Sequence, residues 1–162
     1  MTSSVQTNRQ KTIEMAIKVV RSIYRDAGVS GDYLWMIDQP EFARALFIFN
    51  DNEEQFDAFV AGKARGFAAG DGNAKIRPLR KLVPPRAAGV PTGKHGCGYL
   101  ALDASTKAKI DEALAVVDAL VSTGNYDQIV VSTSKDGDTL GIGTFEVARE
   151  VRDYIYQQLV KP

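Results

Sequence analysis

The chain has 162 residues, of which 44% are hydrophobic, and this is enough for the core of one globular domain. Its 20 basic residues equal its 20 acidic ones, which excludes the basic surplus typical of proteins that bind nucleic acid polymers. A single cysteine, Cys97, excludes an internal disulfide, and with one histidine, His95, it supplies too few ligands for a structural zinc site. No apolar run is long enough for a membrane span, and the polar first ten residues lack a signal-peptide core, so we expect a cytoplasmic protein.

Residues 1–45 are predicted to form a helical appendage. From about Lys11 to Ala27, apolar residues recur at three- and four-residue spacing, and Gly28 follows, which is the pattern of an amphipathic helix that ends at a glycine. Ser30 is a candidate N-cap for a second short helix, and Pro40 favours the start of a third. We expect this appendage to cover an edge of the sheet or to mediate self-association.

Residues 46–162 show alternating strand and helix patterns. We predict an α+β or small α/β fold, with a sheet of about four strands and flanking helices. Leu46 to Phe49 is predicted to be a buried strand, and a helix that carries Phe56 and Phe59 follows it. Further strands are expected at Asn73 to Ile76 and at Gly98 to Leu102.

The second half of this region is predicted to contain two longer helices around one strand. A helix capped by Asp103 or Ser105 carries one apolar stripe and leads to the strand Gln128 to Ser132. A final helix is predicted from about Thr144, its candidate N-cap, to Val160.

The stretch from Gly70 to Gly98, here called the basic segment, is the strongest indication of function. It holds six Lys or Arg residues against one acid, Asp71, so it carries +5 and leaves −5 on the rest of the chain. Rigid Pro, permissive Gly and guanidinium groups suit a loop that presents donors to a phosphate-bearing small molecule. The alternative is a solvated basic surface loop. The candidate ligand-binding residues of this segment are Asn73, Arg77, Arg80, Arg86, Thr92 and Lys94.

A second candidate site lies at Ser132 to Phe145. Ser134 and Lys135 follow a buried strand, and Gly141 and Gly143 precede a helix N-terminus, where N–H groups favour anions. The segment is neither a Walker A loop nor a dinucleotide-binding GxGxxG motif, and a simple Gly-rich turn is the alternative.

Three further residues are candidates for the same ligand. Arg149 and Arg152, three apart on the last helix, can face one pocket, although surface ion pairs are the alternative. Tyr126 is a candidate for stacking on a purine, or else belongs to the core.

The sequence contains no recognisable catalytic set, cofactor motif or metal-binding cluster. Binding without turnover is therefore the favoured hypothesis. An enzyme that processes ADP-ribose or another nucleotide is the alternative, with Asp136, Asp138 or Asn73 as the groups to test. A protein-interaction module that uses the N-terminal helices is a third possibility.

The strings FNDNEEQF, GDGNAKIRPL, PPRAAGVPTG and GDTLGIGTF are similar to those of small phage and prophage proteins. From about Leu46 onward, the chain resembles the Thoeris anti-defence sponges, which bind a cyclic ADP-ribose-type immune signal and withhold it from the host's effector. The resemblance implies a homo-oligomer in the host cytoplasm, with nucleotide pockets at subunit edges. The positions that match such a pocket are Arg77, Arg86, Tyr126, Ser134 and Arg152.

Overall fold

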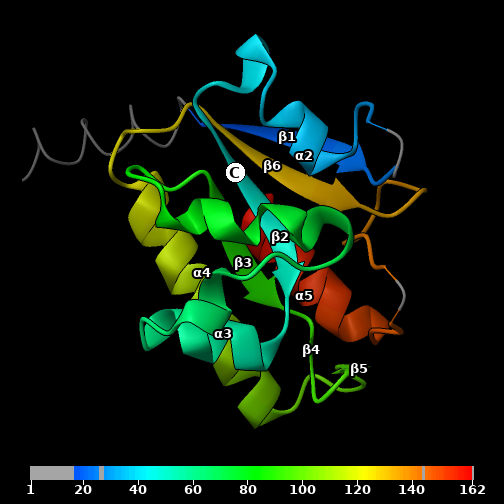
Figure 1. Cartoon of the computed structure of the whole chain (residues 1–162). Helices are drawn as coiled ribbons and strands as arrows, with labels where there is room; N and C mark the ends of the chain where they lie inside the picture. Colours follow the sequence, from blue (N-terminus) through cyan, green and yellow to red (C-terminus); the bar gives the residue numbers. More distant parts are fainter. Residues whose placement is uncertain (1–16, 26–27, 144, 162) are drawn as a thin grey trace, which may run out of the picture.

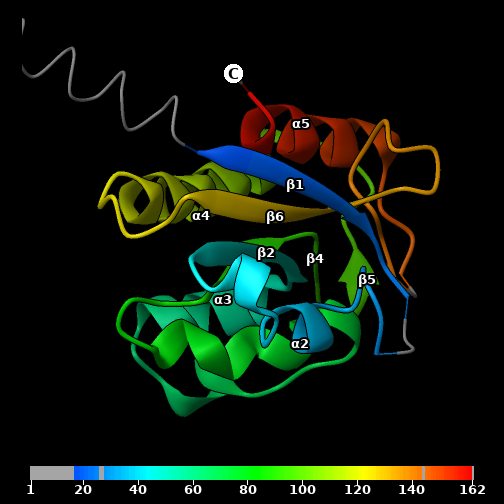
Figure 2. The ribbon, with the colours of Figure 1, turned by 90° about the horizontal axis from the view of Figure 1, so that it is seen from above.

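A four-stranded parallel sheet lies at the centre of the computed structural model, which describes residues 17–25, 28–143 and 145–161 (Figure 1). The strand order is β1-β6-β2-β3, and all three neighbouring pairs are parallel. Helical segments cover both faces of the sheet (Figure 2). The predicted class, a mixed fold with about four strands and flanking helices, is confirmed. The strands are β1 (Lys18–Ile23), β2 (Ala45–Asp51), β3 (Ala87–Pro91) and β6 (Gln128–Thr133).

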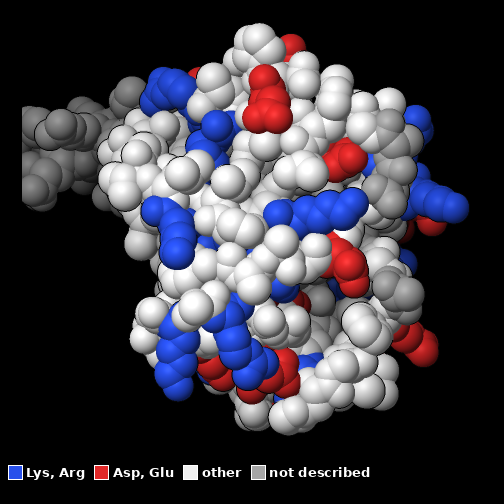
Figure 3. All heavy atoms as spheres, viewed as in Figure 1, with Lys and Arg blue, Asp and Glu red and all other residues white. Residues whose placement is uncertain are grey.

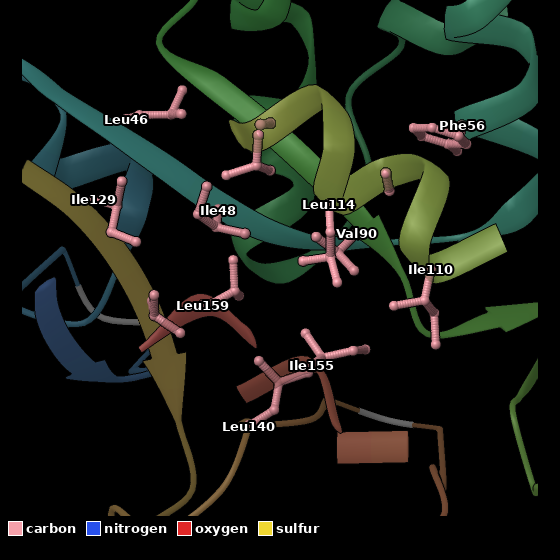
Figure 4. Close-up of a cluster of buried hydrophobic side chains, with 14 of the residues drawn as sticks. Leu46, Ile48, Phe56, Val90, Ile110, Leu114, Ile129, Leu140, Ile155 and Leu159 are labelled. Carbon is pink, nitrogen blue, oxygen red and sulfur yellow. The ribbon is translucent and has the colours of Figure 1, made fainter. Parts of the chain in front are cut away.

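One face of the sheet packs against helices α4 (Ala104–Val121) and α5 (Arg149–Leu159). Leu46 and Ile48 of β2 point to this face and meet Ile110 of α4 and Ile155 of α5 in one apolar cluster (Figure 4). The predicted apolar stripe of α4 therefore faces the core. Asp103 caps this helix, because its Oδ1 accepts a hydrogen bond from the backbone N–H of Thr106 at 2.8 Å.

The other face packs against α2 (Tyr33–Met36) and the 3₁₀ helix η3 (Gly72–Lys81). Phe47 and Phe49, which alternate with the residues of the first face, lie in this second core. The buried hydroxyl of Tyr33 donates to the carbonyl oxygens of Ile48 at 3.0 Å and Val130 at 3.2 Å, so it joins two neighbouring strands. β2 is thus buried on both faces, as expected of an inner parallel strand.

Shorter elements complete the fold. Helix α3 (Glu53–Val60) begins after Asn52, whose Oδ1 accepts from the N–H of Gln55 at 2.9 Å. The remaining connections contain two 3₁₀ helices, η1 (Pro40–Phe42) and η2 (Ala64–Phe67), and an antiparallel hairpin formed by β4 (Gly93–Lys94) and β5 (Cys97–Gly98).

The predicted starts of the two short N-terminal helices are confirmed in one case. Pro40 starts η1 as predicted, whereas α2 is capped by Asp32 and not by Ser30. No helix among the described residues is long and apolar enough to cross a membrane.

The predicted N-terminal helix is wrong where the structure describes it. Residues 18–23 form β1, which pairs with β6 from Lys18↔Gln128 to Ile23↔Thr133, so they belong to the main sheet. Residues 11–16 and 26–27 of that prediction lie outside the described residues. The apolar spacing resembled that of a helix because β1 is an edge strand with exposed residues on both faces. Its β-branched residues favour a strand, and β6 provides the neighbour with which that strand pairs.

Two predicted strands are also wrong. Asn73 to Ile76 lies in the 3₁₀ helix η3, and only Gly98 of the Gly98 to Leu102 stretch belongs to a strand, the two-residue β5. The strand that the sheet uses instead is β3, with the sequence AAGVP. Its small residues are poor strand formers, but Gly89 is required because a Cβ there would lie 2.5 Å from Asp51 Oδ2.

Candidate ligand site at the carboxyl edge of the sheet

The sheet has a topological switch point between β2 and β6. The connection after β2 runs through α3 and η2 to η3, which covers one face, whereas β6 is followed by the loop that leads to α5 on the other face, so the two connections diverge beyond the carboxyl ends of these adjacent strands. Open α/β sheets bind ligands at such a position. The surface is hollowed beside the carboxyl end of β2, between this end and the β4–β5 hairpin (Figure 3).

The last residue of β2, Asp51, is the centre of a buried ion cluster. Its Oδ1 accepts from Arg77 Nε at 3.2 Å and from Arg77 Nη2 at 3.0 Å, and its Oδ2 accepts from Arg80 Nη1 at 2.9 Å. All three side chains are at most 5% exposed. Arg77 and Arg80 lie three residues apart on η3, where 3₁₀ geometry places both on one side.

The guanidinium groups are held by further contacts as well as by the carboxylate. Arg77 Nη1 donates to the carbonyl oxygen of Ala68, and Arg80 donates to the carbonyl oxygens of Gly66 and Gln55. The Arg80 guanidinium also lies 4.3 Å from the ring centroid of Phe59. Burial lowers the pKa of Arg80, and the nearby Asp51 carboxylate opposes that shift.

The basic segment is therefore not the exposed loop that the sequence suggested. Arg77 and Arg80 face inward, because Asp51 supplies the counter-charge that makes their burial possible. The guanidinium of Arg86 also makes its hydrogen bonds within the fold. It donates to the carbonyl oxygens of Phe42 at 2.7 Å, Ala45 at 3.2 Å and Ile37 at 3.3 Å. It thus ties η1 and the end of α2 to the start of β2.

Asn73 and Thr92, two other candidates of the basic segment, also make contacts within the fold, whereas Lys94 is exposed. Asn73 Oδ1 accepts from the backbone N–H of Tyr33 at 3.0 Å, which anchors α2 to η3. The N–H of Thr92 donates to the carbonyl oxygen of Asp51 at 3.0 Å. The hydroxyl of Tyr126 donates to the carbonyl oxygen of Pro85, and its ring is buried in the first core, so this ring does not provide a stacking surface.

The loop between β6 and α5 brings several predicted residues together at the same edge. Arg149 donates to Asp138 Oδ2 at 3.1 Å and to Asp153 Oδ1 at 2.8 Å, the surface ion pairs that the sequence left as an alternative. Ser134 Oγ donates to Asp138 Oδ1 at 3.2 Å. Lys135 is exposed in this loop.

Arg152 differs from these residues in its surroundings. Its Nε is buried and makes no hydrogen bond with any residue that the structure describes.

The last helix begins later than predicted. The predicted N-cap, Thr144, lies outside the described residues, and α5 begins at Arg149 after Ala148.

The structure adds residues that the sequence reasoning missed. Asp51 was not singled out as a site residue, although an acid that directly follows a buried apolar run, upstream of two arginines spaced three apart, was the available signal. Phe145 is 59% exposed and Ile142 is 37% exposed beside the Gly-rich turn. Asn50 Nδ2 donates to the carbonyl oxygen of Gly141 at 2.8 Å, which fixes this turn to the end of β2.

The donor set of this edge consists of guanidinium, amide, hydroxyl and ammonium groups. Within the described ranges, no group of three or more His, Cys, Asp or Glu side chains is placed to hold a metal ion. No family model matches the chain, and neither a curated protein nor a solved structure matches it.

Proposed function

We propose that the chain binds a small phosphate-bearing molecule of the nucleotide class in the hollow at the carboxyl edge of the sheet, and holds it without chemical change. The observation that carries this proposal is the switch point between β2 and β6, with the surface hollowed beside the end of β2 (Figure 3).

Charge and chemistry at this edge support an anionic ligand. The Asp51 cluster contains two guanidinium groups and one carboxylate, so its net charge is positive. Lys135 adds an exposed ammonium group on the loop that follows β6. The exposed ring of Phe145, close in sequence to the Gly-rich turn, is a better candidate for stacking on a base than the buried ring of Tyr126.

Binding without turnover is supported by the hydrogen bonds that three carboxylates of this edge already make. Both oxygens of Asp51 accept hydrogen bonds from guanidinium groups, and Asp138 and Asp153 are paired with Arg149. A general base must reach the proton that it removes, and these carboxylates are engaged. Sequestration of a signal molecule, as the Thoeris sponge resemblance suggests, requires only tight binding and slow release.

Equilibrium dialysis against cyclic ADP-ribose isomers, ADP-ribose and cyclic oligonucleotides tests the proposal. We expect the free concentration of one of these ligands to fall, and heat denaturation of the protein to return it unchanged. Recovery of an altered nucleotide would show the alternative, an enzyme, with the exposed Asp136 as the first residue to replace. Failure to retain any of the phosphate-bearing ligands would overturn the proposal.

We also propose that the chain forms a homo-oligomer, which the same resemblance implies. Light scattering during size-exclusion chromatography tests this point separately from ligand binding. The mass of a single chain at all concentrations would contradict it.

A further inference from the structure

Two arginines between β1 and α5 have no acidic partner among the residues that the structure describes. The side chain of Arg152 makes no hydrogen bond or ion pair with any of these residues. Its Nε is buried, whereas its two Nη nitrogens remain accessible at the surface of this half-buried residue. The exposed Arg21 makes one side-chain hydrogen bond with the described residues, from its Nε to the hydroxyl oxygen of Tyr156 at 2.8 Å. A partly buried cation without a counter-charge is costly.

Both arginines lie beside Tyr156. Arg21 follows Val19 by two residues, and Val19 packs against the first core, so Arg21 points to the face that α5 covers (Figure 2). Arg152 precedes Tyr156 by four residues, so their side chains are neighbours on one side of α5. The Tyr156 hydroxyl donates to the carbonyl oxygen of Gly137 at 3.1 Å, which holds the loop after β6 at the same place.

The carboxylates of this region are bonded to another arginine. Asp153 Oδ1 accepts from Arg149 Nε at 2.8 Å, and Asp138 Oδ2 accepts from Arg149 Nη2 at 3.1 Å. Neither carboxylate makes an ion pair with Arg21 or Arg152. Two like charges beside one hydroxyl group repel each other, so an anion placed between them is favoured.

We infer that Arg21 and Arg152 bind a phosphate group between β1 and α5. A phosphate carries about two negative charges at neutral pH, which matches two guanidinium groups. The phosphate accepts from the accessible nitrogens of Arg152 and from the N–H groups of Arg21 that Tyr156 leaves free. The inference does not rest on the proposed function, because β6 separates β1 from β2 and from the hollow beside the end of β2.

Titration of the full chain with inorganic phosphate at constant ionic strength, followed by calorimetry and by the melting temperature, tests this site. We expect phosphate to raise the melting temperature of the wild-type protein, because a ligand that binds only the folded state stabilises it. Arg21→Gln and Arg152→Gln are each expected to weaken phosphate binding about tenfold or more. Equal phosphate affinity in the wild type and both variants would overturn the inference, as would an equal rise of the melting temperature with chloride.

Arg65→Gln is the matched control. Arg65 is an exposed arginine of η2 whose side chain makes no hydrogen bond or ion pair with any described residue, so its replacement should leave the phosphate affinity unchanged. Without phosphate, Arg152→Gln should not lower the melting temperature, because it breaks no bond with a described residue. A lower melting temperature together with an unchanged phosphate affinity would show that Arg152 is a structural residue, and would overturn the inference.

Methyl phosphate, titrated in the same way, distinguishes a phosphate ester from the free ion as the ligand. Binding of either probe with the expected loss in both variants supports the inference.

Parallel titration with ADP-ribose separates this inference from the proposed function. If phosphate binds in the expected pattern and no nucleotide binds, the inference stands and the proposed function is wrong. If ADP-ribose binds and neither phosphate nor methyl phosphate does, the proposed function stands and the inference is wrong.

Discussion

The carboxylate of Asp51 lies 2.9 Å from the guanidinium of Arg80, and both side chains are almost completely buried. The pair joins the carboxyl end of β2 to η3 and, through the further bond from Arg80 to the carbonyl oxygen of Gly66, to η2. One ion pair thus fixes three elements that border the candidate site.

Asp51→Asn is expected to lower the free energy of unfolding by about 3–5 kcal/mol, because it leaves two buried guanidinium groups without a carboxylate. Urea denaturation followed by circular dichroism measures this change. Asp71→Asn, which removes an exposed carboxylate, is the matched control and should change stability by less than about 0.5 kcal/mol. Similar losses in the two variants would show that the cluster does not stabilise the fold.

Arg86→Met is expected to lower the free energy of unfolding by about 2–3 kcal/mol. The substitution keeps much of the side-chain volume but removes the donor to three backbone carbonyl groups. Arg65→Ala, at an exposed arginine of η2, serves as the control, and the two variants can be compared by their denaturation midpoints. A midpoint for Arg86→Met equal to that of the wild type would contradict the anchoring role of this residue.

Gly66→Ala is expected to destabilise the protein by about 1–3 kcal/mol, since the new Cβ would lie 2.2 Å from the backbone nitrogen of Phe59. The strain should also displace the carbonyl group that accepts from Arg80 at 2.7 Å. Gly143→Ala adds the same methyl group in open space and should leave the melting temperature nearly unchanged. Equal melting temperatures for the two alanine variants would show that the segment of η2 can shift freely.

Asp153→Asn is expected to reduce the loss of stability at acidic pH. The pKa of Asp153 lies below its usual value of 3.8, first because Thr139 donates a hydrogen bond to it and then because Arg149 is close. A carboxyl whose pKa is lowered by folding stabilises the protein above the unfolded pKa, and this stabilisation is lost as the pH falls through the folded pKa. Urea midpoints of the two proteins should therefore converge as the pH falls from about 5 to about 3. A constant difference across that range would exclude this role for the carboxylate.

The elements that were predicted correctly depend on local signals. β2 and β6 are continuous apolar runs, and α3 and α4 begin at residues whose side chains cap them, so a short window of sequence contains the information. β1 and β3 lack such signals. β1 carries exposed residues on both faces, and β3 is built from Ala, Gly, Val and Pro packed between other elements.

The candidate site could be located from sequence only in part. The Gly-rich turn was predicted to follow a buried strand, because a strand followed by glycines and a helix is a local pattern. The burial of Arg77 and Arg80 depends on Asp51, which lies 26 and 29 residues earlier in the chain. Nothing near the arginines indicates that partner, so their charge was assigned to the surface.

The position of β1 at the edge of the sheet affects the order in which the chain folds. Among the strands of residues 17–25, 28–143 and 145–161, β1 pairs only with β6, whereas β2 and β3 are adjacent to each other and separated by a much shorter stretch of chain. During synthesis, β1 must therefore wait for β6 before it can form the ladder hydrogen bonds of this sheet. Such long-range pairing slows folding. Until β6 has been made, the backbone groups of β1 stay unpaired and open to strands of other chains, which exposes a newly made chain to aggregation.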